Sequence, residues 1–206
     1  MSYGAGTERE IKLALDHGVA LPDFDDLESG VRVDDRGVVE LDASYFDTTD
    51  LKLSAAHMAV RRRRGHSWTY KGPSSVDGVA LVREEREWPD SPAMPAELKQ
   101  RLGEQIGDQQ LGAVARLLSL RHRIDLIGSA GQRQLEIDDD DVSVIDGSGA
   151  VVERFREVEV EVVGPASDDL VAAVIAKLIA IGATPHFTSK YTRALRALGY
   201  PRHDSD

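Results

Sequence analysis

The sequence contains no cysteine among its 206 residues. Disulfide bonds, zinc–thiolate sites, iron–sulfur clusters and thiol nucleophiles are therefore excluded, and a reducing cytoplasm is the expected location. No apolar run approaches the ~20 residues that span a bilayer, and the first residues, Met-Ser-Tyr-Gly-Ala-Gly, lack the apolar stretch of a signal peptide. We expect a protein that acts away from membranes.

Basic residues are also scarce relative to acidic ones. The chain has 25 Lys and Arg against 36 Asp and Glu, a formal net charge of −11. This balance argues against general nucleic-acid binding, in which most of the affinity comes from phosphate contacts. The sequence shows no repeat, low-complexity tract or interdomain linker, so we predict one domain over residues 1–200, with 201–206 as a tail or the start of a linker.

The dominant pattern along the chain is alternation with period two, which is typical of strands with two different faces. Strands are predicted at Thr7–Leu15, Leu41–Asp47, Ala59–Gly65, Ser67–Lys71, Val79–Trp88, Arg121–Ile127, Gln132–Asp140 and Glu153–Val163. Helices are predicted at Pro95–Ile106, Gln110–Leu118, Ser167–Ile181 and Ser189–Leu198. The pattern indicates an α+β protein with a large antiparallel sheet.

Several of these strands carry charged or polar side chains at positions i and i+2, which point to the same face. These rows are Glu8, Glu10 and Lys12; Arg61 and Arg63; Thr69 and Lys71; Arg83, Glu85 and Glu87; Arg121 and Arg123; Glu136, Asp138 and Asp140; and Glu157, Glu159 and Glu161. Any one row could be the hydrated outer face of a sheet. Three acidic residues on one exposed strand would repel one another, however. We therefore favour a sheet closed into a barrel, with the rows facing each other across its interior.

Such an interior would suit two kinds of charged ligand. Rows of Lys and Arg would bind a polyanion, and rows of Asp and Glu would hold hard divalent cations through oxygen atoms. Buried charges of both signs are tolerated when they are paired or bound to metal.

The motifs that carry these rows resemble those of one family. They are Glu8-x-Glu10-x-Lys12, Tyr45-Phe46-Asp47-Thr48, Arg61-x-Arg63, Thr69-x-Lys71, Arg83-x-Glu85, Arg121-His122-Arg123, Asp140-x-Val142, the Glu157–Glu161 row and Ser189-Lys190. In this order they are similar to the motifs of CYTH proteins, the triphosphate tunnel metalloenzymes. The resemblance covers residues 7–198.

The resemblance implies a closed eight-stranded antiparallel β-barrel, a triphosphate tunnel, with the helices packed outside. It implies Mg²⁺ or Mn²⁺ as cofactor. By similarity, metal would bind at Glu8, Glu10, Asp140 and Glu159, and also at Glu157 or Glu161, because the motif fits the last acidic row in two registers. Phosphoryl oxygens would bind at Lys12, Arg61, Arg63, Lys71, Arg83, Arg121, Arg123 and Lys190.

The charge pattern predicts a mechanism of phosphoryl transfer to water. Cations neutralise the charge that develops on the bridging oxygen as the terminal phosphoryl group leaves. The catalytic candidates are Lys12 among the cations, and Glu85 or Glu87 as the group that activates the water. We expect hydrolysis of inorganic triphosphate, the activity associated with the bacterial CYTH modules that precede CHAD domains.

Other functions within the resemblance stay open. They are class IV-type adenylyl cyclase activity, thiamine-triphosphate hydrolysis, and a non-catalytic module that binds polyphosphate or nucleotides. The expected partner is a small molecule with a triphosphate group, or polyphosphate. A homodimer, and a CHAD domain in a longer parent chain, are also left open.

Overall fold

The computed structural model describes residues 4–27 and 30–201. The strands are β1 (Gly4–Ala14), β2 (Arg32–Asp47), β3 (Ala59–Arg63), β4 (Ser67–Asp77), β5 (Ala80–Pro89), β6 (Gly112–Ile127), β7 (Arg133–Ile145), β8 (Val151–Val162) and β9 (Thr184–His186). The helices are α1 (Lys52–Ala55), α2 (Ala96–Ile106), α3 (Asp168–Ala180) and α4 (Lys190–Ala197). The predicted tail, residues 201–206, lies outside the described residues except for Pro201.

Eight of the strands form a closed antiparallel barrel. Its order is β5-β4-β3-β2-β6-β7-β8-β1, and a pairing between β1 and β5 closes the ring. β1 pairs with β5 through its first half, whereas Lys12 to Ala14 pair with the short β9. The predicted closed eight-stranded barrel and the α+β class are confirmed.

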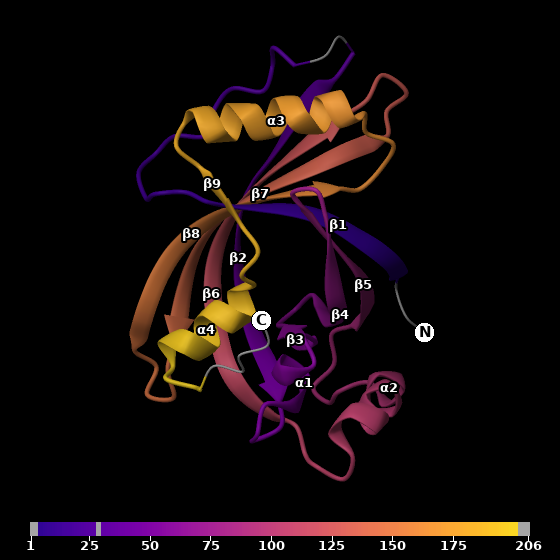
Figure 1. Cartoon of the computed structure of the whole chain (residues 1–206), viewed down its shortest axis with the longest axis vertical. Helices are drawn as coiled ribbons and strands as arrows, with labels where there is room; N and C mark the ends of the chain where they lie inside the picture. The colour runs from indigo at the N-terminus through magenta and orange to yellow at the C-terminus, as the bar shows by residue number, and fades with distance from the viewer. Residues whose placement is uncertain (1–3, 28–29, 202–206) are drawn as a thin grey trace.

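The alternation along β1 explains how the barrel divides its two faces. Ile11 and Leu13 are fully buried against α3, where Leu170, Val174 and Leu178 also have no exposed surface. Glu10 and Lys12 point to the opposite face, into the barrel. Figure 1 shows α3 across one end of the strands, and α1 and α4 near the other end.

Helix α3 begins as the sequence predicts. The side chain of Ser167 accepts a hydrogen bond from the backbone N–H of Leu170, and Asp168 and Asp169 occupy the first turn. Both features stabilise a helix N-terminus. No helix in the described part of the chain is long and apolar enough to cross a membrane.

The predicted helix at Gln110–Leu118 is wrong, because β6 begins at Gly112. Leu111, Val114 and Leu117 recur at a helix-like spacing in the sequence. In the structure, this segment pairs with β2 on one side and β7 on the other. Leu117 points inward to a buried cluster while Leu118 stays partly exposed on the other face, so apolar side chains on both faces hide the alternation.

Strand β4 continues beyond its predicted end at Lys71. The register with β5 shifts between Lys71 and Ser74, so Gly72 and Pro73 lie in a bulge rather than a turn. A bulge tolerates proline because the ladder hydrogen bond is already interrupted there. The first half of β2, the one-turn helix α1 and the three-residue β9 were not predicted.

Candidate anion and metal site inside the barrel

Two cavities occupy the barrel interior. One, of about 340 Å³, lies beside α4 and is lined by Lys12, Arg83 and Lys190, among others. The second, of about 270 Å³, is almost entirely polar and is lined by residues of every strand of the barrel except β2. Arg61, Lys71 and Glu159 line both cavities, so the two meet at the level of these side chains.

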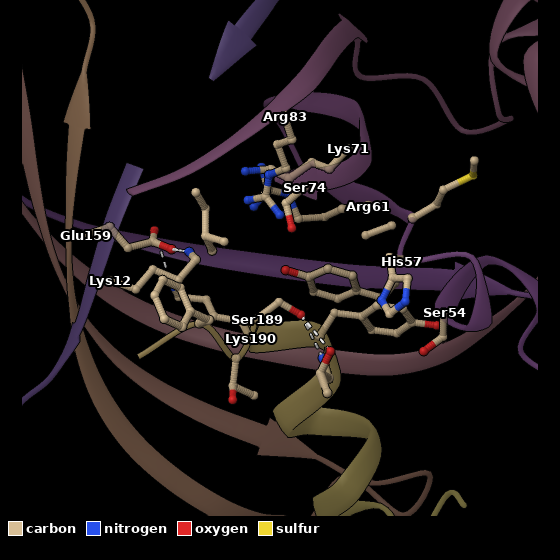
Figure 2. A pocket seen from close by; sticks show the side chains of 18 of the residues that line it. Lys12, Ser54, His57, Arg61, Lys71, Ser74, Arg83, Glu159, Ser189 and Lys190 are labelled. Atoms are coloured by element: carbon tan, nitrogen blue, oxygen red, sulfur yellow. Dashed lines mark hydrogen bonds and ion pairs between the residues drawn. The ribbon is translucent and has the colours of Figure 1, made fainter. Parts of the chain in front are cut away.

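Nearly all predicted site residues reach these cavities. The first cavity has Lys12, Arg61, Lys71, Arg83, Glu159 and Lys190 in its wall. The second has Glu8, Glu10, Arg61, Arg63, Lys71, Glu85, Glu87, Arg121, Arg123, Glu159 and Glu161. Figure 2 shows Arg61, Lys71 and Arg83 on one side of the first cavity and Lys190 on the opposite side. The structure thus brings together side chains from distant parts of the sequence.

Strand register explains why opposite charges meet. Lys12 lies opposite Glu159 in the β1–β8 ladder, and Glu8 lies opposite Arg83 in the β1–β5 ladder. The Glu8 carboxylate accepts from Lys71 Nζ at 2.7 Å and from Arg83 Nε at 2.6 Å. Although burial would raise the pKa of Glu8, these two cations lower it well below its ordinary value.

Asp140 and Glu157 line neither cavity and lie behind Lys190. Lys190 Nζ lies 2.9 Å from Asp140, 2.6 Å from Glu157 and 2.8 Å from Glu159. Burial opposes ionisation of Asp140, but Lys190 and Arg121 lower its pKa to about 2. In this arrangement Asp140 and Glu157 hold cations in place, and metal binding by them stays a prediction.

Arg61 and Arg63 differ from the other cations of the interior. In the described part of the chain, neither guanidinium forms an ion pair within 4.0 Å, and both Nε atoms are buried without a hydrogen-bond partner. Arg61 Nη2 donates a long, 3.4 Å hydrogen bond to Thr69 Oγ1. Burial and the nearby charges of Arg61 and Arg121 lower the pKa of Arg63 to about 9. Positive charge is therefore in local excess, which favours a bound anion.

Negative charge is in excess at another point of the second cavity. Burial and the carboxylates of Glu8 and Glu136 raise the pKa of Glu161 to about 8. Burial and Asp138 likewise raise the pKa of Glu136. A divalent cation would relieve this crowding, and the donor atoms are carboxylate oxygens, the ligands that Mg²⁺ and Mn²⁺ prefer.

The interior therefore fits a hard divalent cation in its chemistry. Its carboxylates are directed toward Lys and Arg side chains, and among residues 4–27 and 30–201 no three acidic or His side chains converge as a ready-made metal cage. Binding of a metal would require some of these ion pairs to separate.

The two predicted water-activating groups have different surroundings. Glu85 lies 2.8 Å from Lys71 Nζ. Glu87 Oε1 accepts hydrogen bonds from Ser67 Oγ at 3.0 Å and Thr69 Oγ1 at 3.1 Å. Glu87 is therefore held by neutral hydroxyl groups, whereas Glu85 is neutralised by a cation.

Sequence reasoning missed several residues of the site. Glu136 and Asp138 line the second cavity; the sequence placed them in one inward-facing row with Asp140, but only Asp140 was given a role. Tyr45, His57 and Tyr191 line the first cavity. No spacing in the sequence connects these three, because they come from β2, the segment after α1, and α4.

Comparison with known proteins agrees with this geometry. Residues 6–182 match the family model described as CYTH domain. Two uncharacterized Mycobacterium tuberculosis proteins, from strains CDC 1551 and H37Rv, are 30% identical to this chain over an alignment of 207 residues. The alignment covers 92% of this chain. The chain spans 40% of the length of these curated relatives.

Two solved structures share the fold at low sequence identity. A candidate adenylate cyclase from Bacillus halodurans is 16% identical, with a TM-score of 0.57 over 92% of this chain and 98% of that one. A candidate adenylyl cyclase from Hippeastrum, described as having a dominant triphosphatase activity, is 16% identical, with a TM-score of 0.53 over 95% of this chain and 97% of that one.

Proposed function

The chain belongs to the CYTH family, and on that premise we propose that it hydrolyses the terminal phosphoryl group of inorganic triphosphate inside the barrel, with Mg²⁺ or Mn²⁺. The observation that carries the proposal is the pair of guanidinium groups, Arg61 and Arg63, that have no acidic partner within 4.0 Å among the described residues. Their planar forks suit phosphoryl oxygens, which they can contact through two parallel hydrogen bonds.

The other cations of the interior would extend this site along a chain of phosphoryl groups. Lys71, Arg121 and Arg123 line the same cavity as Arg61 and Arg63. Each is now paired with a carboxylate; for example, Arg123 Nε lies 2.8 Å from Asp138. A polyanion would compete with these carboxylates for the cations, which supports a ligand with several negative charges over a single phosphate.

Glu8, Glu10, Glu159 and Glu161 are the residues proposed to hold the metal, because all four line the polar cavity. When bound, Mg²⁺ or Mn²⁺ would supply positive charge at the phosphoryl oxygens. The carboxylates would gain a partner as Lys71 and Arg83 turn toward the substrate. Asp140 and Glu157 are proposed to keep Lys190 in position.

The chain's own side chains divide the remaining work. Arg61 and Arg63 would hold the terminal phosphoryl group, and Lys12 would neutralise charge on the bridging oxygen as it leaves. Glu87 or Glu85 would orient the attacking water. Glu87 has the more suitable surroundings, because no Lys or Arg nitrogen of the described residues lies within 4.0 Å of its carboxylate.

A second candidate substrate is an organic triphosphate. The cavity beside α4 has apolar side chains in its wall, including Tyr45, Met58 and Phe187, close to Lys71 and Arg83. This surface favours an organic group attached to the phosphates, as in thiamine triphosphate or ATP. A cyclase acting on ATP would release pyrophosphate and cyclic AMP, whereas a hydrolase would release orthophosphate.

A substrate panel tests the proposal. Purified protein with Mg²⁺ or Mn²⁺ is given inorganic triphosphate, thiamine triphosphate or ATP, and orthophosphate and pyrophosphate are measured separately. We expect orthophosphate release to be fastest from inorganic triphosphate, and Glu8→Gln to slow it by about 100-fold or more. Glu104→Gln, at an exposed position of α2, is the matched control and should retain the rate. Equal rates for wild type and Glu8→Gln would refute the proposal.

A further inference from the structure

The side chain of Asp47, at the end of β2, is a buried carboxylate that is held by neutral donors. It accepts from the backbone N–H groups of Thr48 at 2.7 Å, Leu53 at 2.9 Å and Ser54 at 2.9 Å. A fourth short hydrogen bond comes from the hydroxyl of Tyr191, 2.8 Å from Oδ2, and the Thr48 hydroxyl lies 3.4 Å from Oδ1. Asp47 is 1% exposed, and no cation of the described residues lies within 4.0 Å of it. Four short hydrogen bonds to one carboxylate make this a strong local constraint.

Three of these bonds fold the chain around α1. Leu51 and His57, on either side of α1, both have φ of 56°, a left-handed conformation that is unfavourable for residues other than glycine. The N–H groups of Leu53 and Ser54 lie between them and are fixed by Asp47. Asp47 thus stabilises a strained turn, and Ser54 and His57 of this turn face the cavity in Figure 2.

The fourth bond joins this turn to a distant part of the chain. Tyr191 lies in the first turn of α4, 144 residues from Asp47. Its ring stacks on that of Tyr45, with centroids 5.0 Å apart and planes 3° apart. Tyr45 lies opposite Arg61 in the β2–β3 ladder. A hydrogen bond and a ring stack therefore fasten the start of α4 to the strand beside one of the two unpaired guanidinium groups.

Lys190 is the residue immediately before Tyr191. Its ammonium group enters the barrel and contacts Asp140, Glu157 and Glu159. α4 has only eight residues, and helices this short have little stability without tertiary contacts. The position of Lys190 therefore depends on what holds the first turn of α4.

We propose that Asp47, Tyr45 and Tyr191 form a latch that positions Lys190 in the tunnel, a role that rests on the proposed function for its catalytic consequence. With the latch closed, Lys190 faces the acidic side chains and the phosphate cavity. Loss of the Tyr191 hydroxyl would free the start of α4 and let Lys190 leave this position. Tyr191 is in this sense a positioning residue.

A double-mutant cycle with Lys190 distinguishes positioning from a general structural effect. Tyr191→Phe removes the bond to Asp47 and keeps the ring, and kcat/KM for inorganic triphosphate is measured with Lys190 present and in Lys190→Met. We expect Tyr191→Phe to lower kcat/KM by about 10- to 100-fold when Lys190 is present, the range of a hydrogen bond to a charged group. In Lys190→Met the same change should cost less than about twofold. Equal losses in both backgrounds would overturn the latch.

Hydrogen exchange of the α4 amides tests, without an activity assay, whether the Tyr191 hydroxyl holds this helix in place. Tyr200→Phe is the control. Tyr200 packs against the same apolar cluster as Tyr191, but its hydroxyl makes no hydrogen bond with the described residues. We expect amides of Lys190–Ala197 to exchange about tenfold faster or more in Tyr191→Phe than in Tyr200→Phe. Equal exchange in the two variants would overturn the latch even if the protein hydrolyses triphosphate. If the wild type does not turn over any triphosphate, the proposed function is refuted, and the hydrogen-exchange comparison still tests the latch.

Discussion

Substitution of Arg63, a cation of the tunnel, is expected to change ligand binding and stability in opposite directions. It forms no ion pair with the described residues, and burial together with Arg61 and Arg121 lowers its pKa to about 9. The charged side chain is therefore unfavourable to the folded protein without a ligand. We predict that Arg63→Gln raises the free energy of unfolding by about 1–3 kcal/mol. This range is smaller than the lowered pKa alone implies, because the side chain is partly exposed and solvent screens its charge.

The same change should weaken binding of inorganic triphosphate. Loss of one charge-assisted hydrogen bond from the guanidinium to a phosphoryl oxygen costs about 1.5–3 kcal/mol, and Gln can replace at most one of the two bonds that Arg63 could form. The dissociation constant should rise by about 10- to 150-fold. Titration calorimetry measures this constant, and urea unfolding followed by the fluorescence of the buried Trp68 and Trp88 measures stability.

Two arginines serve as controls for Arg63→Gln. Arg62 is on the opposite face of β3, with Nε 2.7 Å from Asp90, so Arg62→Gln should lose at most about 1 kcal/mol of stability and keep its affinity. Arg121 is buried against Asp138 and Asp140, so Arg121→Gln should lose about 3–5 kcal/mol. The reasoning is refuted if Arg63→Gln is destabilised while its affinity for triphosphate is unchanged.

Three further predictions concern pH, metal and the scaffold. The pKa of Glu161 in the folded protein, about 8, lies above its ordinary value of 4.5, so its protonated form favours folding at low pH and this stability is lost as pH rises through 8. In EDTA, Glu161→Gln should therefore raise Tm at pH 9 but not at pH 4, and equal shifts at both would contradict this. At pH 9, adding Mg²⁺ should raise the Tm of the wild type more than it raises the Tm of the Glu161→Gln variant. Equal gains in Tm would argue against metal binding by Glu161. Leu178→Ala, in the α3 core, should cost about 2–5 kcal/mol in urea unfolding without changing KM, and a changed KM would show that α3 contributes to the site.

The position of many candidate residues inside the barrel was predictable because strand geometry is regular. Residues two apart share a face, so the row Glu8, Glu10 and Lys12 can be read from the sequence, as can the apolar Ile11 and Leu13 that pack against α3. The predicted helix at Gln110–Leu118 failed because pairing with β2 and β7 outweighed a local apolar spacing. Long-range pairing of this kind is not encoded in any short window of sequence.

The partners of each charge could not be predicted in the same way. Asp140 and Glu159 have the same residue types and spacing as other members of their rows, yet Asp140 is sealed behind Lys190 while Glu159 faces both cavities. The side chains beside Arg63 are set by the register of β3 with β2 and β4, which no short stretch of sequence specifies. The contact between Asp47 and Tyr191 spans 144 residues and leaves no periodic signal.

We propose that the tunnel hydrolyses inorganic triphosphate with the help of a divalent metal. The decisive experiment is phosphorus NMR of inorganic triphosphate mixed with purified protein and Mg²⁺, with EDTA-treated protein and Glu10→Gln as comparisons. We predict that orthophosphate and pyrophosphate appear in equal amounts, that EDTA stops the reaction, and that Glu10→Gln slows it by about 100-fold or more. Persistence of the triphosphate signals with wild-type protein and metal, or hydrolysis at the same rate in EDTA, would contradict the claim.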